Sequence, residues 1–85
     1  MFDYSDITNA QIKEAIDSYI HSERDRIILT MNLVDGYTYQ QISDCLYALD
    51  QENKAKGIYT KYELTPRQVS NIILKQEKIV FKHLS

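Results

Sequence analysis

The chain has 85 residues, enough for one domain with a modest hydrophobic core and too few for a core plus a deep enzymatic cleft. Hydrophobic residues make up 44% of the chain and charged residues 26%, which is ordinary globular composition and argues against wholesale disorder. Twelve acidic and ten basic residues give a net charge of -2, which on its face argues against nucleic acid as a partner.

The first two predicted helices are marked by polar residues at their starts. Thr8 and Gln11 form a capping-box pattern, and the helix that follows is predicted to end near His21. Ser22 is the predicted N-cap of a second helix over residues 23–34, with acids in its first turn where the helix dipole favours them. The residues predicted to face the core are Ile27, Ile28, Met31 and Val34, with Leu29 and Leu33 to one side.

A third helix is predicted after the Asp-Gly pair at 35–36, because glycine accepts the left-handed conformation that closes a helix end. Thr38 begins it with a second capping box, and the helix continues through Leu49, with a possible extension to about residue 55. Residues 50–63 lose the periodicity and leave two interpretations: a frayed helix end followed by a loop, or a short extended piece with two-residue alternation. The predicted buried stripe is Ile42, Cys45, Leu46 and Leu49.

The last predicted helix covers residues 66–84, with Thr65 as N-cap, Pro66 in the first position and Gln68 completing a third capping box. The chain is therefore predicted to be a single all-α domain, a compact bundle of four to five helices. The inner stripe of the last helix is predicted to be Val69, Ile72, Ile73, Gln76, Ile79, Val80 and Leu84. Its outer face carries Arg67, Gln68, Ser70, Asn71, Lys75, Lys78 and Lys82.

Several function classes lack their usual signals. His21 and His83 have no cysteine or carboxylate at a metal-ligand spacing, and neither a glycine-rich phosphate loop nor a serine elbow is present. We therefore expect no enzyme activity, no bound metal and no cofactor. Cys45 cannot form an internal disulfide and suits a small buried position. The acidic start does not resemble a signal peptide and no run approaches a membrane span, so we expect a cytoplasmic protein without a membrane partner.

Charge is unevenly distributed, and this reopens nucleic acid as a partner. Residues 1–50 carry a net charge of -6 and residues 64–85 a net charge of +3. The exposed start of the last helix offers arginine, glutamine and asparagine, which bond base edges, and lysines further along suit phosphates. The helix order and these side chains together favour a helix-turn-helix DNA reader.

Two stretches carry a family resemblance. "RDRIILTMNLVDGYTYQQISDCL", residues 24–46, resembles the first half of region 4 of bacterial RNA polymerase sigma factors. "LTPRQVSNIILKQEKIVFKHL", residues 64–84, is similar to the recognition helix of that family and its basic continuation. The resemblance implies a transcription regulator of double-stranded DNA whose last helix enters the major groove, with RNA polymerase as a possible partner. The implied base contacts are Arg67, Gln68, Ser70 and Asn71; the implied phosphate contacts are Tyr39, Gln40, Lys75 and Lys78.

The chain departs from the family pattern in one connection. In the family three or four residues join the two helices, whereas residues 47–64 separate them here, so the domain divides into an N-terminal helix (1–22) and a sigma region 4-like part (23–84) with an insert (50–63). The insert lysines Lys54, Lys56 and Lys61 suit either a wing on the phosphates or a solvated loop. The length leaves no room for the other parts of an initiation factor, so we expect an accessory regulator of the phage or mobile-element type.

A different class of function also fits the sequence. The acidic front half suits an acidic protein-binding module that regulates or inhibits a polymerase or another nucleic-acid enzyme. A homodimer is a further possibility, because DNA readers of this type often work as pairs. The residues expected to serve the acidic module are Asp3, Asp6, Glu14 and Asp17, and those expected to serve self-association are Ile79, Val80 and Phe81.

Overall fold

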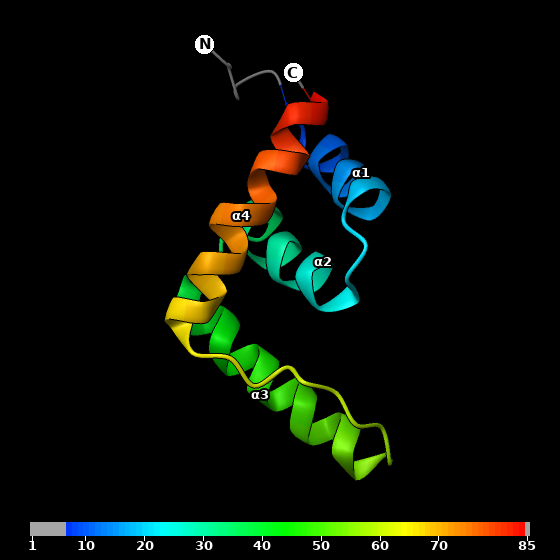
Figure 1. The fold of residues 1–85 in the computed structure, drawn as a ribbon, viewed down its shortest axis with the longest axis vertical. Helices are drawn as coiled ribbons and strands as arrows, with labels where there is room; N and C mark the ends of the chain where they lie inside the picture. The colour runs from blue at the N-terminus through cyan, green and yellow to red at the C-terminus, as the bar shows by residue number, and fades with distance from the viewer. Residues whose placement is uncertain (1–6, 85) are drawn as a thin grey trace.

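In a computed structural model of the protein, the structure describes residues 7–84, so Asp3 and Asp6 of the expected acidic surface lie outside the described residues. Within this range the chain is helical and contains no strand, which confirms the predicted all-α architecture (Figure 1). The second helix runs directly into a π-helical turn, η2. The elements in chain order are α1 (Asn9–Tyr19), α2 (Glu23–Leu29), η2 (Thr30–Val34), α3 (Tyr39–Ala55) and α4 (Pro66–Leu84).

The predicted capping boxes are all present. The Thr8 hydroxyl accepts from the Gln11 N–H at 3.2 Å, and the Gln11 side-chain oxygen accepts from the Thr8 N–H at 2.9 Å. The same reciprocal pairs begin α3, between Thr38 and Gln41, and α4, between Thr65 and Gln68. Each box satisfies two backbone donors that a helix start leaves without partners, so the sequence fixes where these helices begin.

The core lies where α4 crosses α1, α2 and α3. Ile28 and Leu29 are both fully buried, so the prediction that Leu29 lies to one side is wrong. Because α2 packs against both α1 and α4, two successive positions of this short helix are covered. The helix also does not remain α-helical to Val34: the Asp35 N–H donates to the Thr30 oxygen at 3.1 Å, the i to i−5 bond of a π-turn.

Polar contacts fix the junction between α1, α2 and α4. Asp25 is buried, and its carboxylate accepts from the Gln76 side chain of α4 at 2.9 Å and from Arg24 at 3.2 Å. The Arg26 guanidinium donates to the Ile20 and His21 carbonyls, which lie at the end of α1. A buried carboxylate needs such donors, since a buried charge without partners is strongly destabilising.

Residues 57–65, here termed the return strap, carry the chain back along α3 to the start of α4 (Figure 1). α3 continues to Ala55 as predicted, and Gly57 reverses the chain with a φ of 80°. Exposure then alternates: the inner residues Thr60, Tyr62 and Leu64 are half-buried, and Tyr59, Lys61 and Glu63 are exposed. The structure thus has a helix end followed by a segment without regular structure, the first of the two interpretations, and the alternation of exposure in that segment occurs without a strand.

The buried carboxylate of Asp50 holds the strap to α3. Asp50 is 2% exposed, and its oxygens accept from the Thr60 hydroxyl at 2.7 Å and from the Lys54 ammonium at 3.2 Å. The Thr60 hydroxyl, with Lys54 and the Tyr62 backbone N–H, holds the pKa of the Asp50 carboxyl below its ordinary value, against burial, which acts to raise it. The charged form is therefore the one that the folded strap stabilises.

We expect Asp50 to make the stability of the strap depend on acid pH. Because the pKa of Asp50 is lower in the folded chain, its stabilisation is present above the ordinary value of 3.8 and is lost as the pH falls through the lowered pKa. Thr60→Val should lower the urea midpoint at neutral pH, whereas Thr60→Ser, which keeps the hydroxyl, should not. In Asp50→Asn the stability should depend less steeply on pH in this acid range. Equal midpoints for Thr60→Val and Thr60→Ser would contradict this assignment.

Candidate nucleic-acid interface

The face of α4 that points away from the core carries a stripe of polar and basic side chains. The buried residues Val69, Ile73 and Val80 fix which face packs inward. The opposite face bears exposed residues that recur every three or four positions, the spacing of neighbours on one helix face. We term this set the α4 stripe, and its members are Arg67, Asn71, Lys75, Lys78 and Lys82.

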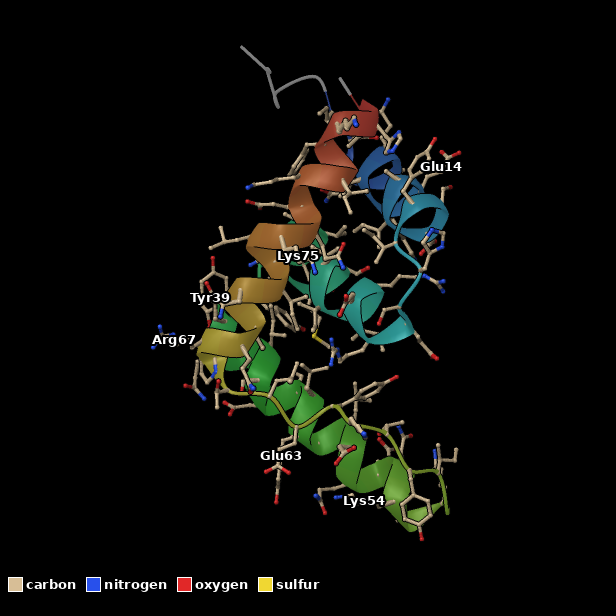
Figure 2. The ribbon with its side chains drawn as sticks, in the orientation of Figure 1. Glu14, Tyr39, Lys54, Glu63, Arg67 and Lys75 are labelled. Atoms are coloured by element: carbon tan, nitrogen blue, oxygen red, sulfur yellow. The ribbon has the colours of Figure 1, made fainter. Side chains whose placement is uncertain are left out.

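The stripe concentrates positive charge although the chain is acidic overall. Arg67 and Lys75 are both exposed on α4, with Arg67 near the start of the helix and Lys75 further along it (Figure 2). Glu77, the one acid of α4, is half-buried and lies outside the stripe. The exposed apolar residue Leu74 borders it, with 51% of its surface accessible. A continuous line of cations on a helix of this length suits a polyanion, because each phosphate neutralised releases a counterion.

The structure distinguishes between the predicted base-contact residues. Arg67 and Asn71 are exposed, and among residues 7–84 their side chains take part in no hydrogen bond. Either side chain could therefore contact a ligand without breaking a hydrogen bond of the fold. Gln68 is exposed, but its side-chain oxygen already accepts from the Thr65 N–H at 2.9 Å. Ser70 is half-buried at the edge of the face. Any contact of Gln68 with a base would therefore compete with its role in the capping box.

The start of α3 lies beside the start of α4. The Ser43 hydroxyl donates to the Leu64 carbonyl, directly before the Thr65 cap, and so ties the strap to the first turns of α3. Tyr39 is exposed at the beginning of α3. Gln40 is also exposed, but its amide donates to Asp44 at 3.0 Å. The predicted phosphate contacts of α3 therefore lie on the helix end that the Ser43–Leu64 hydrogen bond ties to the start of α4.

A groove of about 560 Å³ separates α3 from the start of α4, and two acids line it. Asp44 comes from α3 and Glu63 from the strap, whereas Tyr47 and Pro66 supply apolar surface. Both carboxylates are exposed, so they set a negative potential on one side of the α4 stripe. The sequence did not predict this acidic border, because residues 50–63, which include Glu63, show no periodicity from which their position could be inferred.

The insert lysines lie apart from the stripe. Lys54 is at the far end of α3 from Arg67 (Figure 2) and pairs with buried Asp50. Lys56 lies 3.9 Å from a carboxylate oxygen of Glu52, and both side chains are 63% exposed. Lys61 is exposed on the strap. The structure therefore does not bring the three lysines together with Arg67, and their phosphate contacts stay predictions.

The remaining residues singled out in the sequence lie away from the start of α4. The His83 ring stacks on Tyr19 of α1, with the ring centroids 3.6 Å apart. Glu14 and Asp17 of the expected acidic surface are exposed on α1. Val80 is fully buried, so it belongs to the core and offers no surface for the self-association expected through Ile79, Val80 and Phe81. Among residues 7–84, no cluster of three histidine, cysteine, aspartate or glutamate side chains has a geometry that would hold a metal ion.

Comparisons with known proteins leave the chain without an assigned family. No family model matches it, and neither the curated proteins nor the solved structures contain a match. Across residues 7–84, no helix has both the length and the apolar character to cross a membrane.

We expect substitution of the N-cap residue Thr65 to destabilise the protein more than substitution of the exposed residue Asn71. Thr65→Ala removes the cap hydroxyl that accepts from the Gln68 N–H, and should lower the free energy of unfolding by about 1 kcal/mol. Asn71→Ala changes an exposed side chain and should shift it by less than about 0.5 kcal/mol. Urea denaturation followed by circular dichroism measures both, and a larger cost for Asn71→Ala would assign that residue to the fold instead.

Proposed function

We propose that this protein is a sequence-specific, double-stranded-DNA-binding transcription regulator that places α4 in the major groove. The observation that carries the proposal is the α4 stripe, in which Arg67, Asn71, Lys75, Lys78 and Lys82 lie opposite the buried face of one helix. Arginine bonds guanine and asparagine bonds adenine through two hydrogen bonds each, and lysines further along the same face bond phosphates.

The return strap supports the proposal, because it brings the start of α4 back beside α3 despite the long connection between the two helices. A helix-turn-helix needs the second helix to begin beside the first. The strap runs back along α3, and the Ser43–Leu64 hydrogen bond holds Thr65 near the first turns of α3. The protruding half of α3 and the strap are then an addition to the reader and leave the start of α4 in place.

Within this proposal Arg67 and Asn71 read bases, and Lys75 and Lys78 hold phosphates. Gln68 joins the readers when its side chain leaves the capping box, at the cost of one hydrogen bond from the Thr65 N–H. Ser70, Tyr39 and Gln40 border the same surface as secondary contacts. The resemblance to sigma factor region 4 makes promoter DNA the expected target and RNA polymerase an expected neighbour.

We expect binding of duplex DNA to depend steeply on salt and on the α4 stripe. Fluorescence anisotropy of a labelled duplex over a salt series should give a log–log slope of about -2.7 to -4.5, the value for three to five phosphate contacts. Arg67→Ala/Lys75→Ala should weaken binding by about tenfold or more and reduce the slope by about 1 to 2. Lys13→Ala, which removes one exposed cation from α1, should leave both unchanged.

The outcome separates the proposal from its main rival. No binding to duplex at low salt, or equal losses for the α4 double variant and Lys13→Ala, would overturn the DNA assignment. The rival function, binding of a basic protein partner through the exposed acids Glu14 and Asp17 of α1, would then be favoured.

The acidic groove border should oppose DNA binding. Glu63→Gln removes a carboxylate beside the start of α4 and should raise affinity for duplex DNA by about two- to threefold at low salt. Glu14→Gln is the matched control, because it makes the same change on α1, far from Arg67 (Figure 2), and should have no effect. Equal effects of the two substitutions would mean that net charge, and not the position of Glu63, governs binding.

A further inference from the structure

Leu74 is an exposed aliphatic side chain at the edge of the α4 stripe. It is 51% exposed, and within residues 7–84 it is neither a core residue nor one of the apolar side chains packed against the core. It lies three residues after Asn71 and four before Lys78, so these three side chains are neighbours on one helix face. Packing within the chain therefore gives Leu74 no role in the core, and its surroundings are those of the stripe.

These surroundings restrict the ligand that Leu74 can contact. Arg67, Lys75 and Lys78 are exposed cations on the same helix. The centre of a protein–protein interface is apolar and depleted of charged residues, and one leucine among cations does not supply such a centre. A nucleic-acid duplex offers phosphates to the cations and base edges to the side chains between them. Leu74 therefore suits a small apolar group that belongs to an anionic ligand.

The major groove of DNA offers one apolar group of this size. Its base edges present hydrogen-bond donors and acceptors, together with the C5 methyl group of thymine, which apolar side chains contact. Asn71, one turn before Leu74, carries the amide that suits the donor and acceptor of adenine. Two neighbouring side chains of α4 are therefore both suited to A·T pairs.

The spacing along α4 indicates which base pairs these side chains reach. A rise of about 1.5 Å per residue separates Leu74 from Asn71 by about 4.5 Å along the helix axis, and from Arg67 by about 10.5 Å. Successive base pairs are about 3.4 Å apart. With α4 lying along the groove, the thymine of Leu74 is therefore about one step from the adenine of Asn71. It is about three steps from the guanine of Arg67.

We infer that Leu74 is a specificity-determining residue that contacts the C5 methyl group of a thymine in the major groove. The ligand of the α4 stripe is then duplex DNA with two adjacent A·T pairs, its contacted thymine about three steps from a G·C pair. The inference rests on the proposed function, and it adds the class of DNA sequence and the residue that reads the thymine. Contact between the methyl group and Leu74 removes apolar surface of both from water. Leu74 therefore discriminates between bases without contributing a phosphate contact.

The test compares thymine with uracil, which differs from it by the absence of the C5 methyl group. Duplexes that bind the wild-type protein are selected from a pool of random sequence, and the selected duplex is made again with uracil at each thymine in turn. At one thymine, uracil should weaken binding by about three- to fivefold in fluorescence anisotropy. Leu74→Ala should weaken binding of the thymine duplex by at least a similar factor, and should bind the two duplexes equally.

Two control variants separate a methyl contact from other effects. Ile79→Ala shortens an aliphatic side chain of α4 that is 37% exposed and lies outside the stripe, and it should keep the preference for thymine. Leu74→Ala should leave the salt slope unchanged, because it removes no phosphate contact, whereas Lys75→Ala should reduce the slope by about 1. Circular dichroism checks that each variant is folded.

The outcomes distinguish this inference from the proposed function. A selected duplex without adjacent A·T pairs, or one in which uracil binds as well as thymine at every position, would overturn the inference and leave DNA binding established. A preference for thymine that persists in Leu74→Ala, or that is lost equally in Ile79→Ala, would overturn the assignment to Leu74. A pool from which no duplex is enriched would overturn the proposed function, and the inference with it.

Discussion

The contact between the Asp50 carboxylate and the Thr60 hydroxyl is the constraint on which the arrangement of α3 and α4 depends. The connection between these helices is long, and ordering its backbone costs about 1 to 2 kcal/mol per residue. Tyr62 and Leu64 offset part of that cost by packing against the core, and Asp50 fixes which residues face inward. Once the strap is in place, the Ser43–Leu64 hydrogen bond determines where Thr65 begins α4.

α4 packs into the core with one face and exposes the basic stripe on the other. Its inner residues Val69, Ile73 and Val80 join the core against three other helical segments, so the helix is held along its length. Its outer residues then form a straight stripe, because positions three or four apart share one face. The net acidity of the chain does not contradict the basic surface at the start of α4, since Glu14 of α1 lies far from Arg67 (Figure 2) and charges are screened beyond a Debye length of about 8 Å.

The sequence predicts the features of this fold that are local. Capping boxes at Thr8, Thr38 and Thr65 fix the starts of three helices, because each box involves residues three positions apart. The burial of Leu29 and the Asp25–Gln76 hydrogen bond were not predictable in the same way, because they depend on elements distant in the chain. The strap had no periodic signal for a helix, and its alternation is short. Its contacts with Asp50 therefore appear first in the structure, as does the acidic border formed by Asp44 and Glu63.

The surroundings of α4 also restrict how a duplex would approach under the proposed function. Asp44 and Glu63 line the groove on the α3 side of the helix start, so phosphates are repelled there. The stripe offers cations on the solvent side, so phosphates are attracted there. Under the proposed function, a duplex would reach the exposed Arg67 and Asn71 side chains without breaking a hydrogen bond of the fold, whereas the Gln68 side chain is held by the Thr65 cap. Arginine and asparagine would then begin the reading of base edges, with glutamine joining after the duplex is seated.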